Sequence, residues 1–143
     1  GHYTVYNRDI CKTPEEKKQT ELQGIGADYF LCGTNAITED GILVNIDGYG
    51  NRCAAIIWGP ENVIMVVGMN KVVKTLDDAI ARARNEAAPV NAQRFDVKTP
   101  CKATGSCANC KSPDSICCQV VVTRMSKIPG RIKVILVNED LGF

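Results

Sequence analysis

At 143 residues, the chain is long enough for one domain that buries about two-thirds of its unfolded surface, so a core can form without disulfides. The 17 basic and 16 acidic residues give a formal net charge of +1, which excludes a long-range field that attracts nucleic acid or an anionic membrane. No apolar run reaches the ~20 residues of a membrane span, and the first residues lack a signal-peptide pattern. We therefore expect a soluble, cytoplasmic protein with a single domain over residues 1–143.

The first predicted element is a helix that begins after Thr13. Thr13 is a suitable N-cap, Pro14 suits the first helical position, and Glu16 is placed for a capping box. The glycines at 24–26 end this helix. Residues 27–32 then predict a short buried strand.

Residues 34–52, with the sequence TNAITEDGILVNIDGYGNR, carry the densest set of polar residues and glycines in the chain. Within them, residues 42–46 predict a buried strand. A hairpin-type turn at 39–41 precedes the strand, with Gly41 free to take positive φ, and a second glycine turn at 47–50 follows it. These turns serve either the fold alone or a binding site that loops present beside a rigid strand.

If this stretch is an active site, Glu39 is the candidate general base or nucleophile, because a carboxylate on a tight turn can be held against a substrate. Arg52 suits bidentate pairing with a carboxylate or a phosphate. The other candidate ligand-binding residues are Thr38, Asn45, Asp47, Gly48, Gly50, Asn51, Asn70 and Lys71. A solvated loop lysine is the alternative for Lys71. His2 lies in an end without a predicted element, so no Ser-His or Cys-His dyad is available.

The middle of the chain alternates strands and helices. Residues 53–58 predict a short helix with Asn51 as its N-cap, and residues 62–68 predict a strand that is covered on both faces. Thr75 caps a further helix, which Pro89 stops. Strand followed by helix, twice over, predicts an α/β fold with a mostly parallel sheet and flanking helices.

Two further strands are predicted near the end of the chain, at 119–123 and 132–137. Residues 127–130 between them form a turn that permits a hairpin. Before these strands, residues 98–118 are rich in Gly, Pro, Ser and Cys and show no apolar periodicity. We expect an irregular loop there.

Five of the eight cysteines lie in that loop. The spacing C-x5-C-x2-C-x6-C allows four thiols to converge on a metal: Cys101, Cys107, Cys110 and Cys117. Zinc and an iron-sulfur cluster both suit four thiolates, and two disulfides or free thiols are the alternative. The single C-x2-C and the uneven spacing favour a cluster slightly. Cys118 is either a core residue or the fourth ligand in place of Cys117.

The other three cysteines, Cys11, Cys32 and Cys53, are scattered singly. Cys32 ends an apolar strand and Cys53 enters an apolar run, so both fit small core residues better than reactive thiols. A composition rich in Val, Ile and Ala likewise indicates an intracellular core rather than a disulfide framework.

The stretch at 34–52, the run GPENVIMVVGMNKVV with AAPVNAQR, and the ending VILVNEDLGF resemble the LUD, or lactate-utilisation, domain family. The loop TPCKATGSCANCKSPDSIC is similar to that of its stand-alone, cysteine-containing members. The resemblance implies a fold similar to ribose-5-phosphate isomerase, glucosamine-6-phosphate deaminase, CoA transferases and 5-formyltetrahydrofolate cyclo-ligase. Family members usually carry further helices and strands before this region, so we expect a C-terminal portion of a longer protein.

The resemblance implies a bacterial lactate-utilisation-type protein, a component of iron-sulfur-dependent oxidation of lactate or a related 2-hydroxy acid. Two alternatives stay open: a transferase-like enzyme that acts on a phosphorylated or acyl substrate at the strand ends, and a non-catalytic, metal-stabilised scaffold. The expected partners are a small anionic ligand and redox proteins. We expect no binding to nucleic acid or to a membrane. The sequence leaves open whether the chain forms a homo-oligomer or acts as a monomer. Because the family places a ligand crevice there, we interpret residues 34–52 as a binding site.

Overall fold

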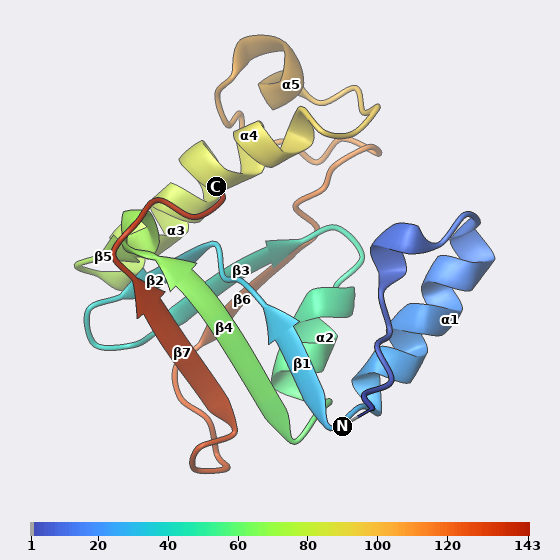
Figure 1. Ribbon diagram of the computed structural model, residues 1–143. Coiled ribbons are helices and arrows are strands. Elements are labelled where there is room, and N and C mark those ends of the chain that lie inside the picture. The colour runs from blue at the N-terminus through green and yellow to red at the C-terminus, as the bar shows by residue number, and fades with distance from the viewer. Residues whose placement is uncertain (1) are drawn as a thin grey trace.

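Two β-sheets lie face to face in the computed structural model, which describes residues 2–143 (Figure 1). One sheet is entirely parallel, in the order β1 (Tyr29–Cys32), β4 (Asn62–Gly68) and β7 (Ile132–Val137). The other sheet has the order β5 (Val72–Val73), β2 (Ala36–Thr38), β3 (Leu43–Asp47) and β6 (Gln119–Thr123). In it, β2 pairs parallel with β5, whereas the pairings of β3 with β2 and with β6 are antiparallel.

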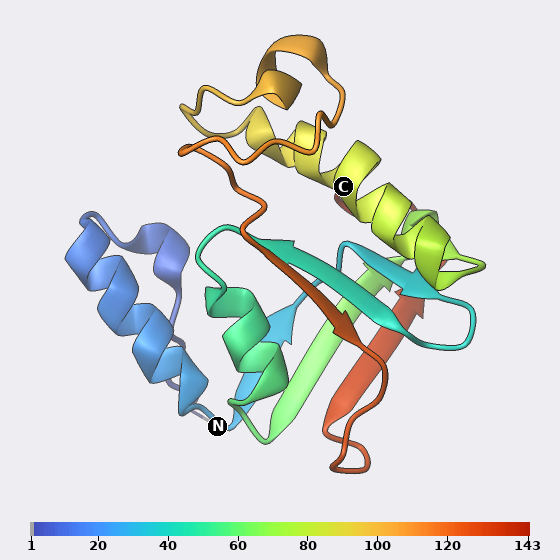
Figure 2. The same ribbon diagram turned by 180° about the vertical axis from the view of Figure 1, so that it is seen from behind.

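Helices flank the two sheets (Figure 2). They are the 3-10 helices η1 (Arg8–Ile10) and η2 (Met69–Lys71), the π turn η3 (Ala83–Ala87), and the helices α1 (Pro14–Ile25), α2 (Asn51–Ile57), α3 (Leu76–Arg82), α4 (Ala88–Ala92) and α5 (Pro100–Thr104). Three of the five strand pairings within residues 2–143 are parallel, which confirms the predicted α/β class with a mostly parallel sheet. No helix in this range is both long enough and apolar enough to span a bilayer.

The core has two parts, one on each face of the four-stranded sheet. Between the sheets, Leu43 belongs to a cluster with Ile56 of α2 and Met65 of β4. On the other face, Val44 belongs to a cluster with Ala79 of α3. Successive side chains of a strand point to opposite faces, so β3 contributes to both parts. This position explains why residues 42–46 are apolar without strict alternation.

The first helix confirms its sequence signature. Glu16 N–H donates to Thr13 Oγ1 at 3.1 Å, and Thr13 N–H donates to Glu16 Oε2 at 3.4 Å, so the predicted capping box forms. Pro14 is the first helical residue and Gly26 is the C-cap. The positive φ of Gly41 is confirmed as well, and residues 62–68 form the predicted strand. The strand is not covered on both faces, because Val66 is 44% exposed.

Pro89 does not stop the helix that begins after Thr75, so that prediction was wrong. The chain continues from α3 through the π turn into α4, which ends at Ala92. Proline lacks an N–H, and its ring crowds the carbonyl four residues earlier. In the π turn, Ala88 N–H donates to Ala83 O, five residues earlier, and this wider turn accommodates the ring.

The strands at 119–123 and 132–137 do not pair with each other, so the hairpin that the turn at 127–130 permits does not form. β6 pairs with β3 in the four-stranded sheet, whereas β7 pairs with β4 in the parallel sheet. The turn signal between them is local, but the choice of a partner strand depends on which face of each strand is buried. Two local details also differ from expectation: Gly50 rather than Asn51 is the N-cap of α2, and the short helix α5 interrupts the cysteine loop.

Arg131 joins the parallel sheet to α2. Its side chain is buried, and its Nε donates to Pro60 O at 3.0 Å, its Nη1 to Ile56 O at 2.6 Å and its Nη2 to Ala55 O at 3.0 Å. The last carbonyls of a helix lack intrahelical partners and carry partial negative charge. Arg131 therefore caps the C-terminus of α2.

We expect Arg131→Met to lower the free energy of unfolding by about 3 kcal/mol, because three buried carbonyl oxygens lose a charged donor. Urea denaturation measures this change. Arg124→Met, at an exposed arginine on the same segment, is the matched control and should stay within about 0.5 kcal/mol of the unsubstituted chain. Equal losses in the two variants would contradict the capping role.

Candidate functional site

Arg52 organises the carboxyl end of β3. Its Nε and Nη2 donate to Asp47 Oδ1 at 3.0 and 2.8 Å. Its Nη2 also donates to Asn35 Oδ1 at 2.7 Å and Ile46 O at 3.2 Å, and its Nη1 donates to Gly33 O at 3.3 Å. Gly33 and Asn35 belong to the link between β1 and β2, so one side chain connects the two sheets.

Asp47 is stabilised as a carboxylate. Its Oδ2 accepts the N–H of Cys53 at 2.8 Å, in the first turn of α2. Burial raises the pKa of Asp47, but the charge of Arg52 and the hydrogen bonds from Cys53 and Arg52 outweigh burial and hold this pKa below its usual value. The hydrogen bonds of Arg52 thus go to groups of the chain itself, and its pairing with an external anion stays a prediction.

A second cation lies where β1 and β4 end. Lys71 is 7% exposed and makes no hydrogen bond or ion pair through its side chain within residues 2–143. A Cβ placed on Gly33 would lie 3.9 Å from Lys71 Nζ, and one placed on Gly142 would lie 3.4 Å from it. Burial lowers the pKa of Lys71, and the charges of Arg82 and Arg52 lower it further. The charges that act on this ammonium are therefore those of two other cations.

Arg82 reaches the same segment from α3. Its Nε donates to Asn70 O at 2.8 Å and its Nη1 to Asn35 O at 2.5 Å. Glu86 lies 3.7 Å from Arg82 Nε, and its side chain is 68% exposed. Burial lowers the pKa of Arg82, and the charge of Glu86 offsets this only in part. Sequence reasoning missed Arg82, because an arginine in the last turn of a helix is commonly a solvated charge.

The C-terminal residues fold back over this end of β4. Asn70 Nδ2 donates to Gly142 O at 3.2 Å, and Leu141 N–H donates to Asn70 Oδ1 at 3.2 Å. A Cβ on Gly68 would lie 2.5 Å from Leu141 N, so only glycine fits beneath the tail. Asn70, a predicted ligand-binding residue, thus fastens the tail beside Lys71.

Asn45 is fully buried, and neither polar atom of its side-chain amide has a hydrogen-bond partner within residues 2–143. It lies beside Asn35, because Asn35 N–H donates to Val44 O at 3.2 Å and Asn35 Oδ1 accepts the N–H of Ile46 at 2.8 Å. A buried polar group without a partner costs about 1–3 kcal/mol. Asn45 is therefore a buried polar side chain without partners, next to the segment at 33–35 that Arg52 and Arg82 bind.

Glu39 lies apart from these cations. It is exposed, in the turn that joins β2 to β3, whereas Arg52 binds at the opposite end of β3 (Figure 1). At the rise of a strand, the length of β3 separates the two ends by about 13 Å. The neighbouring Thr38 is buried, and its Oγ1 accepts the N–H of Ile42 at 2.8 Å, which closes the turn. Glu39 and Thr38 therefore do not share a site with Arg52, and their predicted roles stay predictions.

Three predicted ligand-binding residues have structural roles in the fold: Gly48, Gly50 and Asn51. A Cβ on Gly48 would lie 3.4 Å from Ile116 Cα, so this turn packs against the end of the cysteine loop. Gly50 has a φ of 81°, a conformation that glycine adopts without strain. Asn51 Nδ2 donates to Glu21 Oε1 at 2.8 Å, which joins α2 to α1. A ligand-binding role for these three residues stays a prediction.

The cysteine loop lies at the end of α4 (Figure 2). Within its C-x2-C, Cys107 Sγ accepts the N–H of Asn109 at 3.4 Å, and Asn109 has a φ of 49°. Cys101 is buried, with the hydroxyl of Thr99 at 3.4 Å from its Sγ. The backbone therefore turns back around the Cys107 sulfur.

Cys117 is half-buried at the end of the same loop. Burial raises its pKa to about 11, and the charges of Cys101, Cys107, Cys110 and Cys118 raise it further. Within residues 2–143, no three His, Cys, Asp or Glu side chains adopt a metal-binding arrangement. The metal, its ligand set and the choice between Cys117 and Cys118 stay predictions.

Cys53 is confirmed as a core residue, with 3% of its surface exposed. Burial raises its pKa to about 12, and the hydrogen bond and charge of Asp47 raise it further. Burial likewise raises the pKa of Cys32 to about 11. Both are therefore protonated, unreactive thiols at neutral pH.

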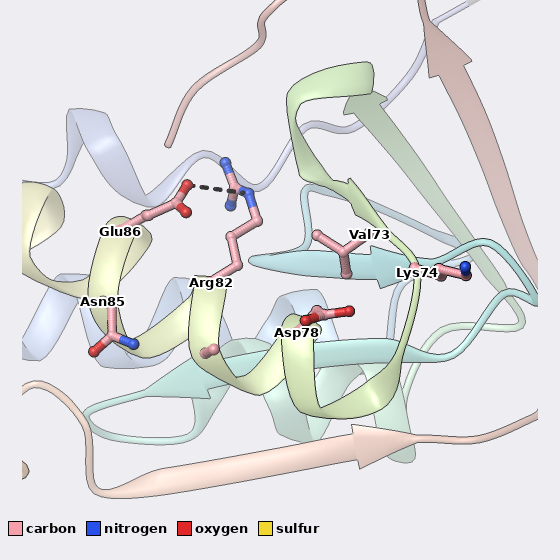
Figure 3. A pocket seen from close by; sticks show the side chains of 7 residues that line it. Val73, Lys74, Asp78, Arg82, Asn85 and Glu86 are labelled. Atoms are coloured by element: carbon pink, nitrogen blue, oxygen red, sulfur yellow. Dashed lines mark ion pairs between the residues drawn. The ribbon is translucent and has the colours of Figure 1, made fainter.

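A shallow hollow of about 400 Å³ lies on the outer side of α3 (Figure 3). It is lined by Val73, Lys74, Asp78, Ala81, Arg82, Asn85 and Glu86. In Figure 3 the guanidinium of Arg82 lies beside Glu86 and away from Lys74. The hollow is open to solvent, and most of its side chains are exposed. Of its lining residues, only Arg82 also belongs to the group of cations at the ends of β1 and β4.

The LUD domain family model matches residues 2–137. The chain belongs to the LUD domain family. A comparison with curated proteins and a comparison with solved structures each gave no match. Membership confirms the resemblance seen in the sequence, is compatible with the observed α/β fold, and associates this LUD domain with lactate utilisation in general terms.

We expect Asp47→Asn to lower the free energy of unfolding by about 3 kcal/mol near neutral pH, because Arg52 loses its counter-ion. The pKa of Asp47 is lower in the folded chain, so its contribution is complete above the unfolded value of about 4 and is lost as pH falls through the folded value. The loss in the variant should therefore shrink in acid. Urea denaturation across this pH range measures both effects.

Asp96→Asn, at an exposed aspartate, is the control for that experiment and should leave the free energy of unfolding unchanged near neutral pH. A destabilisation of Asp47→Asn that stays constant from neutral to strongly acidic pH would show that the charge of Asp47 is not what stabilises the fold.

Proposed function

We propose that this LUD-domain protein takes part in the oxidation of lactate or a related 2-hydroxy acid, and that its cysteine loop holds an iron-sulfur cluster. The observation that carries the proposal is the C-x5-C-x2-C-x6-C spacing, which places four cysteines in one short loop. Family membership supports the link to lactate utilisation. The cluster and the oxidation are this proposal's own additions.

The residues present fit such a group by their chemistry. Thiolates are the preferred ligands of iron-sulfur clusters, and the donors in question are Cys101, Cys107, Cys110 and Cys117. The N–H that Cys107 Sγ accepts from Asn109 is of the kind that tunes cluster potentials, because hydrogen bonds to sulfur stabilise negative charge. Cys118 is exposed at the edge of the loop, so Cys117 is the more sheltered fourth donor.

When bound, a cluster supplies one-electron redox chemistry. The chain's own contribution is to hold the thiolates and to exclude water from part of the site. Cys101 is buried, and α5 carries it against α4. A role in lactate oxidation then requires a redox partner protein and a compartment that keeps thiols reduced, for which we propose the cytoplasm.

Anaerobic purification, followed by metal and sulfide analysis and an ultraviolet-visible spectrum, tests the proposal. We expect iron and inorganic sulfide in the unsubstituted protein and their loss in Cys107→Ser and in Cys110→Ser, because each variant removes one thiolate ligand. Cys11→Ser is the control, since Cys11 lies 3.3 Å from Thr20 Oγ1 in the N-terminal region and not in the loop. It should retain the full iron content.

Zinc without iron would replace the redox centre by a structural one and contradict the redox role. Neither metal in the anaerobic protein would overturn the metal site altogether. Growth on lactate as sole carbon source tests the metabolic part: a host that carries Cys110→Ser in place of the unsubstituted gene should fail to grow, and a host with Cys11→Ser should grow normally.

A further inference from the structure

The cations at the ends of β1 and β4 outnumber the carboxylates that pair with them within residues 2–143. Arg52, Lys71 and Arg82 are three cations, and the carboxylates paired with members of this group are Asp47 and Glu86. Asp47 is engaged by Arg52, and Glu86 reaches Arg82 from the exposed side of α3. One positive charge, that of Lys71, has no partner within the part of the chain that the structure describes.

A buried ammonium without a counter-ion destabilises the fold. A charge removed from water loses hydration, and this loss is recovered only through an opposite charge or hydrogen-bond acceptors. Within residues 2–143 the ammonium of Lys71 has neither, and the two charges that act most on it are those of Arg82 and Arg52. The missing interaction is one that a bound anion provides.

Two glycines flank the ammonium of Lys71. A Cβ on Gly33 would lie 3.9 Å and one on Gly142 3.4 Å from its Nζ, so a side chain at Gly142 would crowd this ammonium. Gly142 is exposed, so the approach from solvent passes the tail. Arg82 uses its Nε and Nη1 on backbone carbonyls, and its Nη2 donates to no group within residues 2–143. The donors available to a ligand are therefore Lys71 Nζ and Arg82 Nη2, rather than the two parallel N–H groups of one guanidinium.

We propose that Lys71 and Arg82 bind the carboxylate of a small organic acid where β1 and β4 end. A carboxylate supplies one negative charge for the one ammonium that pairs with no carboxylate within residues 2–143. The carboxyl ends of parallel strands are also where open α/β sheets bind ligands. The carboxylate chemistry rests on these charges; the choice of a 2-hydroxy acid rests on the lactate function proposed above.

Isothermal titration calorimetry of the full chain with sodium lactate, sodium acetate and sodium phosphate, at constant ionic strength, tests this site. We expect both carboxylates to bind and phosphate to bind more weakly. Lys71→Met should weaken carboxylate binding roughly ten- to a hundredfold, the effect of removing one hydrogen bond to a charged group. Lys74→Met, at an exposed lysine three residues further on, is the control and should change the affinity by less than about twofold.

Lys71→Met should also keep or raise the Tm, because it replaces an unpaired buried charge by an apolar side chain of similar length, so lost binding cannot be ascribed to unfolding. Arg82→Gln is the second variant and should weaken binding as well. Unchanged affinity in Lys71→Met, or phosphate binding tighter than both carboxylates, overturns the site. Binding of acetate without lactate supports the site and contradicts the lactate function instead.

Discussion

The link between β1 and β2 constrains the whole molecule. In three residues, 33–35, the chain leaves the parallel sheet and enters the four-stranded one, so its carbonyl groups cannot join either ladder. Buried carbonyl groups need donors. Arg52 donates to Gly33 O and Arg82 donates to Asn35 O, and Asp47 holds Arg52 in place. The relative position of the two sheets thus depends on two arginines that come from α2 and α3.

The two candidate sites are connected by one helical rod. Arg82 lies at the end of α3, and α4 continues from the π turn towards the cysteine loop (Figure 1). The C-terminal tail follows the same direction: Asn70 binds it beside Lys71, and Arg94 lies 5.8 Å from the ring centroid of Phe143. π turns occur frequently at functional sites, and this one lies between the buried cations and the thiols.

Local sequence patterns predicted those parts of the fold that local physics determines. The capping box at Thr13, the turn at Gly41 and the apolar run of β4 each form as expected. β2 and β5 were not predicted, because strands of three and two residues are too short to show a period. The partners of β6 and β7 are non-local, and the structural roles of Arg82 and Arg131 depend on carbonyl groups that are distant in sequence. No local sequence pattern around these strands or arginines indicates such distant partners.

The remaining polar features oppose stability, and they lie together. Within residues 2–143, the side-chain amide of Asn45 is buried without a hydrogen bond and Lys71 is buried without a counter-ion; Asn45 lies beside Asn35 and Lys71 beside Gly33. Elsewhere the chain satisfies its buried polar groups well: Arg131 meets three carbonyls, and Asp47 accepts bonds from Arg52 and Cys53. Natural proteins depart from such consistency mainly at functional sites. The same arginines that stabilise the link therefore create, next to it, a positively charged place where an anionic ligand completes the interactions that the chain alone leaves unmade.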